Sequence, residues 1–270
     1  MTYLLTPLNH IRIAILLYSF SLLQKMPSQK EFLSRIKDFF SFSRQERNNL
    51  LLAILLLAFI FSFRDWGKES FSFTQGIQHF ILMFLVAGIS ILFRISCQKL
   101  YGLSEGYKIE FRVWWTGMLI SLVLAFITFG KVPIVLLGGA TSAFMVRQRL
   151  GEFRYGHSYW QSGMISLWAV YASLILAIFF ALGKFALPES YFFAKGIWFN
   201  LIMGLCALLP LPRLEGINIF FAARWLYVVA IVLLAVTAFL LLINTAWSLI
   251  IVIIGGAIIA AAYLITGSGK

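Results

Sequence analysis

Few residues in this chain combine a chemically capable side chain with an apolar setting. Glu215 follows an apolar run at 192–209, and the two cysteines, Cys97 and Cys206, lie within or at the end of apolar runs. Carboxylates and thiolates can bind metal ions, although a cysteine in an apolar run, such as Cys97, more often serves as a small residue in helix packing. A carboxylate at membrane depth is costly and is usually paired with a cation. Arg213 is the nearest cation in sequence.

The elements that must position these residues follow from composition. Of the 270 residues, 61% are hydrophobic and 12% are charged, whereas a soluble domain has about 45–50% apolar and about 25% charged residues. Stretches that approach the roughly 20 apolar residues of a membrane-spanning helix recur along the chain. A closed barrel would need alternating segments of about ten residues, but these runs are apolar on all sides. We therefore predict an all-α, multi-pass membrane protein.

Apolar runs define an expected polytopic bundle of about six to eight transmembrane helices. They cover 49–63, 75–97, 113–129, 132–146, 160–182, 192–209, 224–243 and 246–265. The run at 132–146 is short and contains Gly138 and Gly139, so we expect a small re-entrant or strand-like insertion there. Polar and apolar residues alternate at 107–115, which predicts a strand at the membrane interface.

Charge separates an N-terminal region, 1–48, from the expected transmembrane domain, 49–270. Residues 25–47 are rich in Lys and Arg, which predicts a cytoplasmic position. A capping-box spacing and apolar residues on one helical face predict a short amphipathic helix on the membrane there, with a solvated linker as the alternative. The apolar run at 13–23 has no cationic lead-in or cleavage site, so we interpret it as an anchor or an interfacial helix.

The excess of cations bears on the choice of partner. Lys and Arg number 22, against 10 Asp and Glu. Because the cations lie between the apolar runs, they are placed to meet the anionic headgroups of a lipid bilayer. We therefore predict lipid contact and no nucleic-acid partner.

A proline-containing motif closes one of the apolar runs. Residues 196–216 read GIWFNLIMGLCALLPLPRLEG. The tail LLPLPRLEG resembles the second metal-ligand motif of the site-2 protease family of intramembrane zinc metalloproteases, Asn-Leu-Leu-Pro-x-Pro-Pro-Leu-Asp-Gly, whose Asp ligates zinc. The positions shared with that pattern are Leu208, Leu209, Pro210, Pro212, Leu214 and Gly216. Ala207, Arg213 and Glu215 replace the Asn, the second Pro of the pair and the Asp.

Two further stretches extend the resemblance over roughly residues 75–245. Residues 162–173 read SGMISLWAVYAS and look like the family's NGKISLAGPLTN segment. Residues 106–129 resemble the stretch that follows the first metal motif in archaeal members. The resemblance thus implies the helical framework of that family and the plasma membrane of a prokaryote, an archaeon in particular.

The first metal motif is degenerate in this chain. Counting back from residue 106, FRISC at 93–97 occupies the place of the family's His-Glu-x-x-His motif. Phe93 offers no lone pair, and Arg94 cannot act as a base because its guanidinium stays protonated in proteins. Cys97 and Glu215 remain as candidate ligands, fewer than the three protein ligands of a catalytic zinc site. We predict no catalytic residue and no bound metal, and zinc as the cofactor only if the protein is an enzyme after all.

The three histidines do not repair the site. On one continuous helix His79 lies fourteen residues before Phe93, which is about 21 Å along the axis. His157 lies in a polar stretch and is interpreted as a loop or interface residue, and His10 lies near the N-terminus. The resemblance implies that the two family motifs face each other. Arg94 and Glu215 are therefore predicted to form an ion pair in the space of the lost zinc site, which a separation of more than about 6 Å would contradict.

The implied function is that of a pseudoprotease, which binds a transmembrane partner or forms a subunit of a membrane complex. The residues expected to receive the partner are Pro210, Pro212, Arg213, Glu215 and Gly216. The strand at 107–115 could add backbone pairing. A divergent but active intramembrane zinc metalloprotease is one alternative, and a transporter or channel subunit is another. The latter calls for ionisable residues inside the spans, and the run at 224–243 has none beyond Arg224.

Overall fold

The structure is a computed structural model that describes residues 29–66, 72–145, 159–243 and 247–256. In these ranges most residues are helical, and two strands form one small sheet. In chain order the elements are α2 (Gln29–Phe39), α3 (Arg44–Ser62), the 3-10 turn η1 (Phe63–Asp65), α4 (Phe73–Ser104), β1 (Tyr107–Val113), α5 (Trp115–Ile127), β2 (Gly138–Met145), α6 (Tyr159–Ala186), α7 (Tyr191–Ala207), α8 (Glu215–Ala222) and α9 (Arg224–Ile243). A further short helix covers Trp247–Gly256.

Four of the described helices are long and apolar enough to cross a membrane. They are α3 together with η1, α4, α6 and α9. The helix α5 has 13 residues and α7 has 17, so both fall short of the roughly 20 residues that span a bilayer. Membrane-helix character is therefore established by length and composition, and the predicted six to eight spans are not confirmed.

The apolar run at 132–146 contributes a strand. Its residues 138–145 form β2, which pairs antiparallel with β1 from Tyr107↔Met145 to Val113↔Gly138. Gly138 has a φ of +120°, and a Cβ there would lie 2.3 Å from the carbonyl oxygen of Arg112, so only glycine fits. The predicted strand-like insertion is thereby confirmed, and the run does not cross as a helix.

The predicted strand at 107–115 is also present, over a slightly shorter range. Along β1 the side chains of Tyr107, Ile109 and Phe111 are buried, while those between them are more exposed. This is the two-residue alternation of a sheet with one covered face. The strand ends at Val113, because Trp115 already begins α5.

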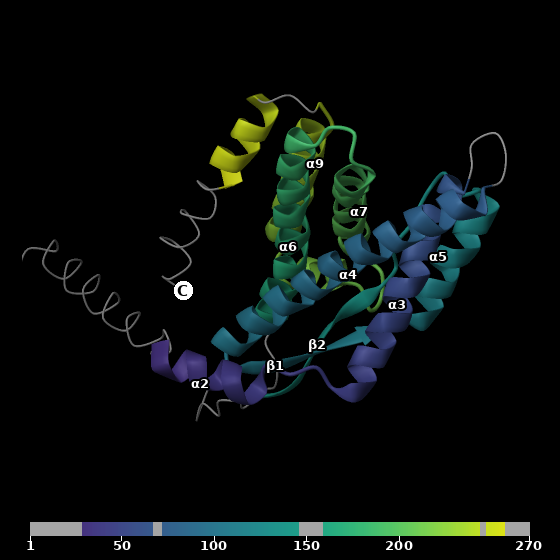
Figure 1. Cartoon of the computed structure of the whole chain (residues 1–270). Helices are drawn as coiled ribbons and strands as arrows, with labels where there is room; N and C mark the ends of the chain where they lie inside the picture. Colours follow the sequence, from purple (N-terminus) through teal and green to yellow (C-terminus); the bar gives the residue numbers. More distant parts are fainter. Residues whose placement is uncertain (1–28, 67–71, 146–158, 244–246, 257–270) are drawn as a thin grey trace, which may run out of the picture.

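The long helix α4 is the centre of the arrangement. In Figure 1 it runs obliquely through the molecule, with α6, α7 and α9 grouped on one side and α3 and α5 side by side on the other. Both strands, α3, α6 and α7 contact it. Side chains of α4 can therefore meet residues of α2, α3, α6, α7 and both strands.

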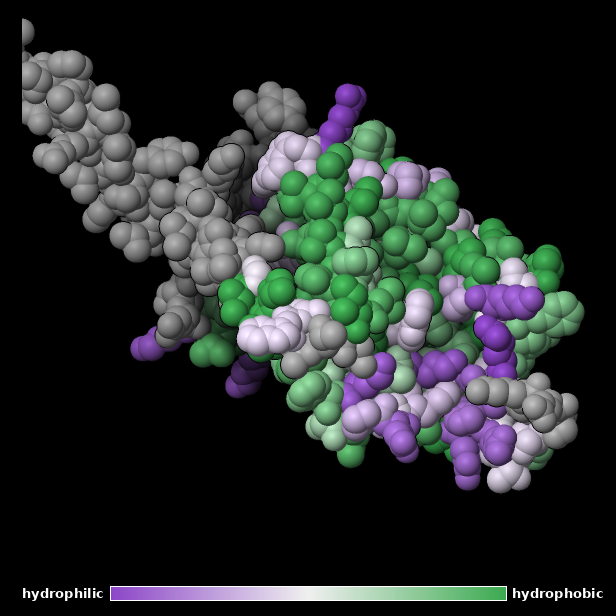
Figure 2. Space-filling view, turned by 90° about the horizontal axis from the view of Figure 1, so that it is seen from above, coloured by the Kyte–Doolittle hydropathy of each residue, from purple (hydrophilic) through white to green (hydrophobic). Residues whose placement is uncertain are grey.

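Figure 2 shows a face on which hydrophobic side chains form a broad area, with hydrophilic side chains gathered beside it.

The basic N-terminal segment contains the helix expected there. It is α2, and its Arg35 is buried and donates a hydrogen bond to the carbonyl oxygen of Leu103 near the end of α4, at 3.2 Å. This contact fixes α2 against the bundle, whereas its contact with a membrane stays a prediction. The predicted anchor at 13–23 lies outside the described residues.

Candidate functional site

Arg94 and Glu215 form a buried ion pair between α4 and α8. The Arg94 Nη2 atom lies 2.8 Å from Glu215 Oε1, and the two side chains are only 1% and 0% exposed. This confirms the pair predicted between the two degenerate motifs. The nearer cation in sequence, Arg213, is exposed and is not the partner.

The turn at 208–214 places Glu215. The helix α7 ends at Ala207, and the chain then makes backbone hydrogen bonds between residues three apart. The N–H of Leu209 donates to the carbonyl oxygen of Cys206, and the N–H of Leu214 donates to that of Leu211. Proline ends a helix because it lacks an N–H group, which suits this turn. Arg213 adopts a φ of +69°, a region that a non-glycine residue rarely occupies. The turn brings Glu215 into the first turn of α8, where the helix dipole favours a negative charge.

Two glycines allow the backbone to close around Glu215. A Cβ on Gly216 would lie 2.3 Å from the carbonyl oxygen of Leu208, so the turn and α8 meet more closely than any side chain would permit. From β2, an added Cβ on Gly139 would lie 3.0 Å from the Arg213 carbonyl oxygen and 3.8 Å from Glu215 Cδ. The strand, the turn and α8 therefore enclose the carboxylate together.

Arg94 belongs to a buried polar stripe on α4. Ser90, Arg94 and Gln98 follow at four-residue spacing, which places them on one helical face. Ser90 Oγ accepts a hydrogen bond from Asn200 Nδ2 of α7 at 2.9 Å. Gln98 Nε2 donates to the carbonyl oxygen of Ile165 in α6 at 3.5 Å. The stripe thus joins three helices along the interior of the bundle.

The polar groups of this stripe, and those that contact it from α7 and α8, are incompletely hydrogen-bonded. Among the described residues, Arg94 Nε, Gln98 Oε1, Asn200 Oδ1 and both carboxylate oxygens of Glu215 have no partner with hydrogen-bond geometry. Arg94 and Glu215 are therefore held together mainly by charge attraction across the 2.8 Å contact. Buried polar atoms are nearly always satisfied in native proteins, so these atoms retain hydrogen-bonding capacity that the described residues do not use.

The remaining positions of the first motif do not complete a metal site. Phe93 packs against the hydrophobic core, and Cys97 is half-buried. No group of three or more His, Cys, Asp or Glu that could hold a metal ion occurs in the described part of the chain. The second cysteine, Cys206, is engaged as a hydrogen-bond acceptor, since its Sγ receives the N–H of Val135 at 3.4 Å.

Of the histidines, only His79 lies within the described ranges. Its Nδ1 is 3.0 Å from the carbonyl oxygen of Asp65, and its ring stacks on Tyr191 with centroids 4.2 Å apart. The structure therefore places His79 in a separate cluster at the start of α4, as expected from its distance to Phe93. His10 and His157 lie outside the described residues.

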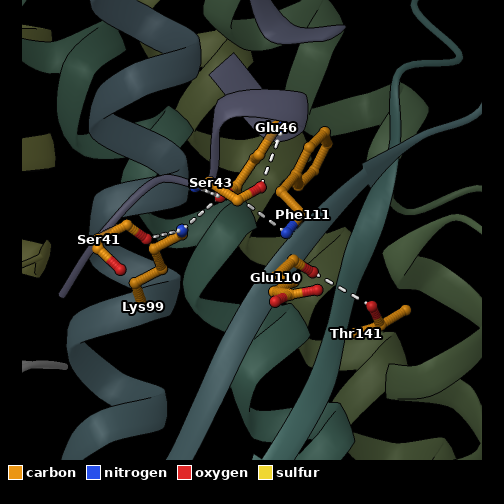
Figure 3. A network of polar contacts seen from close by, with 7 residues as sticks. All are labelled: Ser41, Ser43, Glu46, Lys99, Glu110, Phe111 and Thr141. Carbon is orange, nitrogen blue, oxygen red and sulfur yellow. Dashed lines mark hydrogen bonds and ion pairs between the residues drawn. The ribbon is translucent and has the colours of Figure 1, made fainter. Parts of the chain in front are cut away.

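A second buried ion pair, not anticipated from the sequence, links α4 to α3 and β1. Lys99 Nζ lies 2.8 Å from Glu46 Oε2, and it also donates to the carbonyl oxygen of Ser41 at 2.8 Å. Glu46 Oε1 accepts the N–H of Phe111 at 3.0 Å. Figure 3 shows Lys99 and the Phe111 N–H both reaching Glu46, with Ser41 beside Lys99. The available signal was the Ser43-x-x-Glu46 spacing of a capping box, which the structure forms.

The comparisons with known proteins give a distant relationship. The chain is 25% identical over 181 residues to a protein of Methanocaldococcus jannaschii (strain ATCC 43067 / DSM 2661 / JAL-1 / JCM 10045 / NBRC 100440) that bears the name "Putative zinc metalloprotease MJ0611". The match covers 66% of this chain and 84% of that protein. No family model matches the chain, and no solved structure matches it. The class that these findings support is a helical membrane protein distantly related to a protein named as a zinc metalloprotease.

Proposed function

We propose that this protein is a catalytically inactive relative of the site-2 intramembrane proteases that binds a transmembrane partner. The observation that supports it best is the 2.8 Å contact between Arg94 and Glu215. These residues stand where the resemblance places the family's catalytic glutamate and its carboxylate ligand. The guanidinium thus occupies the neighbourhood that a zinc ion would need.

Electrostatics supplies the reason for inactivity. A guanidinium stays protonated and has no acceptor, so Arg94 cannot take a proton from a water molecule. A fixed cation 2.8 Å from the carboxylate competes with a metal ion for Glu215. By Coulomb's law, the guanidinium also repels the metal ion. Phe93 adds no ligand, and Cys97 alone cannot restore a site with three protein ligands.

Partner binding is proposed for the turn before α8. Pro210, Pro212 and Arg213 are exposed, whereas Glu215 and Gly216 are buried. Among the five residues proposed to receive a partner, the first three can make direct contact, and the last two hold the turn in shape. Helix packing and backbone pairing are the interactions by which such a surface would recognise a membrane segment.

Cross-linking in native membranes tests the binding proposal. A photoreactive amino acid at Leu211 in this turn should capture a distinct membrane protein. The matched control is the same label at Phe185, an exposed residue at the end of α6. Recovery of the labelled chain only as a solitary monomer, or equal capture from both positions, would contradict the proposal.

The name of the relative favours one second candidate, an active zinc metalloprotease. Elemental analysis of the purified protein separates the two functions. The pseudoprotease should contain much less than one zinc per chain, both before and after Cys97→Ala. Stoichiometric zinc that disappears in the Cys97→Ala variant, or cleavage of a membrane peptide by the pure protein, would establish the enzyme. Residence in the plasma membrane of an archaeon stays a prediction.

A further inference from the structure

An apolar groove runs between α3, α4 and α5, away from the Arg94–Glu215 pair. It has a volume of about 420 Å³ and is lined by four residues of α3, including Leu56 and Phe59, together with Phe80, Leu122 and Phe126. All of these side chains are apolar, and Phe126 is 51% exposed. The groove therefore opens on the outside of the bundle, where a membrane protein meets lipid chains.

One end of the groove leads to two cations. The Phe59 and Phe126 rings both approach Phe63, with centroids 5.7 Å and 5.1 Å from it. A Cβ on Gly130 would lie 3.3 Å from Phe63 Cβ and 2.8 Å from Arg64 Cγ. Arg64 and the residue after Gly130, Lys131, therefore lie at this end of the groove.

These two cations are exposed and have no acidic partner among the described residues. The neighbouring carboxylate, Asp65, is already engaged, because Lys195 Nζ and Tyr191 Oη each lie 2.6 Å from its Oδ2. Arg64 and Lys131 thus form a positive site at the end of the apolar groove, which is the charge pattern that an anionic lipid requires.

The size of the groove and the charge at its end together distinguish between occupants. A transmembrane helix about 10 Å wide and 30 Å long fills roughly 2,400 Å³, so only one side of it could lie in a groove of about 420 Å³, whereas a single hydrocarbon chain is small enough to lie in the groove. The two cations at its end match the phosphate of a lipid and not an apolar helix. We propose that this groove binds one anionic phospholipid, with an acyl chain between α3 and α5 and the phosphate at Arg64 and Lys131.

Lipid titration of the full-length, delipidated protein in detergent tests the headgroup site. Native mass spectrometry should show tighter binding of dioleoylphosphatidylglycerol than of dioleoylphosphatidylcholine. The Arg64→Gln/Lys131→Gln variant should bind the anionic lipid about 30-fold more weakly, since each cation contributes about fivefold. Equal binding of the two lipids by the unaltered protein would overturn the proposal.

A matched pair of cations controls for general attraction. Arg44 and Arg47 are exposed at the other end of α3, so Arg44→Gln/Arg47→Gln should leave the tightest binding event unchanged. If this variant weakens phosphatidylglycerol binding as much as the change at Arg64 and Lys131, the site is not where we place it.

The acyl-chain site has its own test. Leu122→Trp and, separately, Leu56→Trp should fill the groove and weaken the binding of both lipids, with size-exclusion profiles confirming that each variant is folded. A photoreactive amino acid at position 122 in native membranes should add the mass of a phospholipid. Capture of a protein segment, a second copy of this chain or its own terminal residues instead of lipid would overturn the proposal.

Discussion

Two buried ion pairs lie close together on α4 and differ in how well they are satisfied. Around Lys99 and Glu46, the ammonium has two oxygen partners and sits 4.0 Å above the Phe42 ring, while both carboxylate oxygens accept hydrogen bonds. Around Arg94 and Glu215, both carboxylate oxygens and the guanidinium Nε lack hydrogen-bond partners among the described residues. Buried ion pairs offset the cost of desolvation only when their polar atoms are well hydrogen-bonded. The Lys99–Glu46 pair is therefore expected to stabilise the fold more than the Arg94–Glu215 pair does.

The largest expected effect is a gain of metal at the poorly satisfied pair. The variant Phe93→His/Arg94→Glu/Cys97→His would supply two imidazoles one turn apart, with Glu215 as third ligand and a glutamate base. We expect about one zinc per chain by elemental analysis, against much less in the unaltered protein. The same variant with Glu215→Ala should lose that zinc. A folded triple variant that binds no zinc would show that the helices no longer hold the geometry of a metal site.

The second-largest expected effect comes from breaking the well-satisfied pair of Lys99 and Glu46. Glu46→Ala leaves Lys99 buried without its countercharge and Phe111 N–H without its acceptor. Such a break should lower the free energy of unfolding by about 3–5 kcal/mol, measured by denaturant titration in detergent. The control is Glu31→Ala, which removes a partly exposed carboxylate paired with Arg35. It should cost less than Glu46→Ala, because Arg35 keeps its hydrogen bond to the carbonyl oxygen of Leu103. If the two variants lose similar amounts of unfolding free energy, the Glu46 network does not have the structural role that we predict.

A third experiment replaces both members of each pair by apolar residues. Arg94→Leu/Glu215→Leu should stay within about 1 kcal/mol of the unaltered protein or be more stable, because replacing a whole buried pair removes its desolvation cost. Glu46→Leu/Lys99→Met should remain destabilised by about 2 kcal/mol, because Phe111 N–H loses its acceptor and α3 loses its capping box. If both double variants cost the same, the two pairs do not differ in the way their contacts indicate.

The candidate site was largely predictable because its two halves carry recognisable motifs. Arg94 and Glu215 lie far apart in sequence, and only the resemblance to facing family motifs could bring them together. Lys99 and Glu46 are 53 residues apart and lie among other charges at the ends of apolar runs, where the sequence does not specify which cation meets which acid. Gln98 and Ser90 were also missed, although their spacing from Arg94 was the available signal.

The sequence predicted the class of fold, a helical membrane protein with a small strand-like insertion, better than the number of membrane spans. Apolar length identified the helices, but hydropathy does not distinguish a helix that crosses lipid from a shorter one that is largely buried in protein, such as α7, or from a short and largely exposed one, such as α5. The strands β1 and β2 were expected, because alternation and a glycine pair are local features. The pairing of Gly139 with Arg112, and its approach to Glu215, depend on tertiary contacts that no local pattern contains.

The smallest expected effect comes from two serines, one near each ion pair, whose hydroxyl groups each accept a hydrogen bond. Ser43 Oγ accepts the Glu46 N–H at 3.1 Å and caps α3, so Ser43→Ala should cost about 1 kcal/mol of unfolding free energy. Ser90 Oγ accepts from Asn200 Nδ2, but that amide also donates to the carbonyl oxygen of Gly196 at 2.8 Å. Ser90→Ala should therefore cost less than Ser43→Ala in the same denaturant titration, because the Asn200 amide keeps a partner. A larger loss at Ser90 would mean that the polar stripe on α4 holds the bundle together, which would remove the contrast between the two pairs.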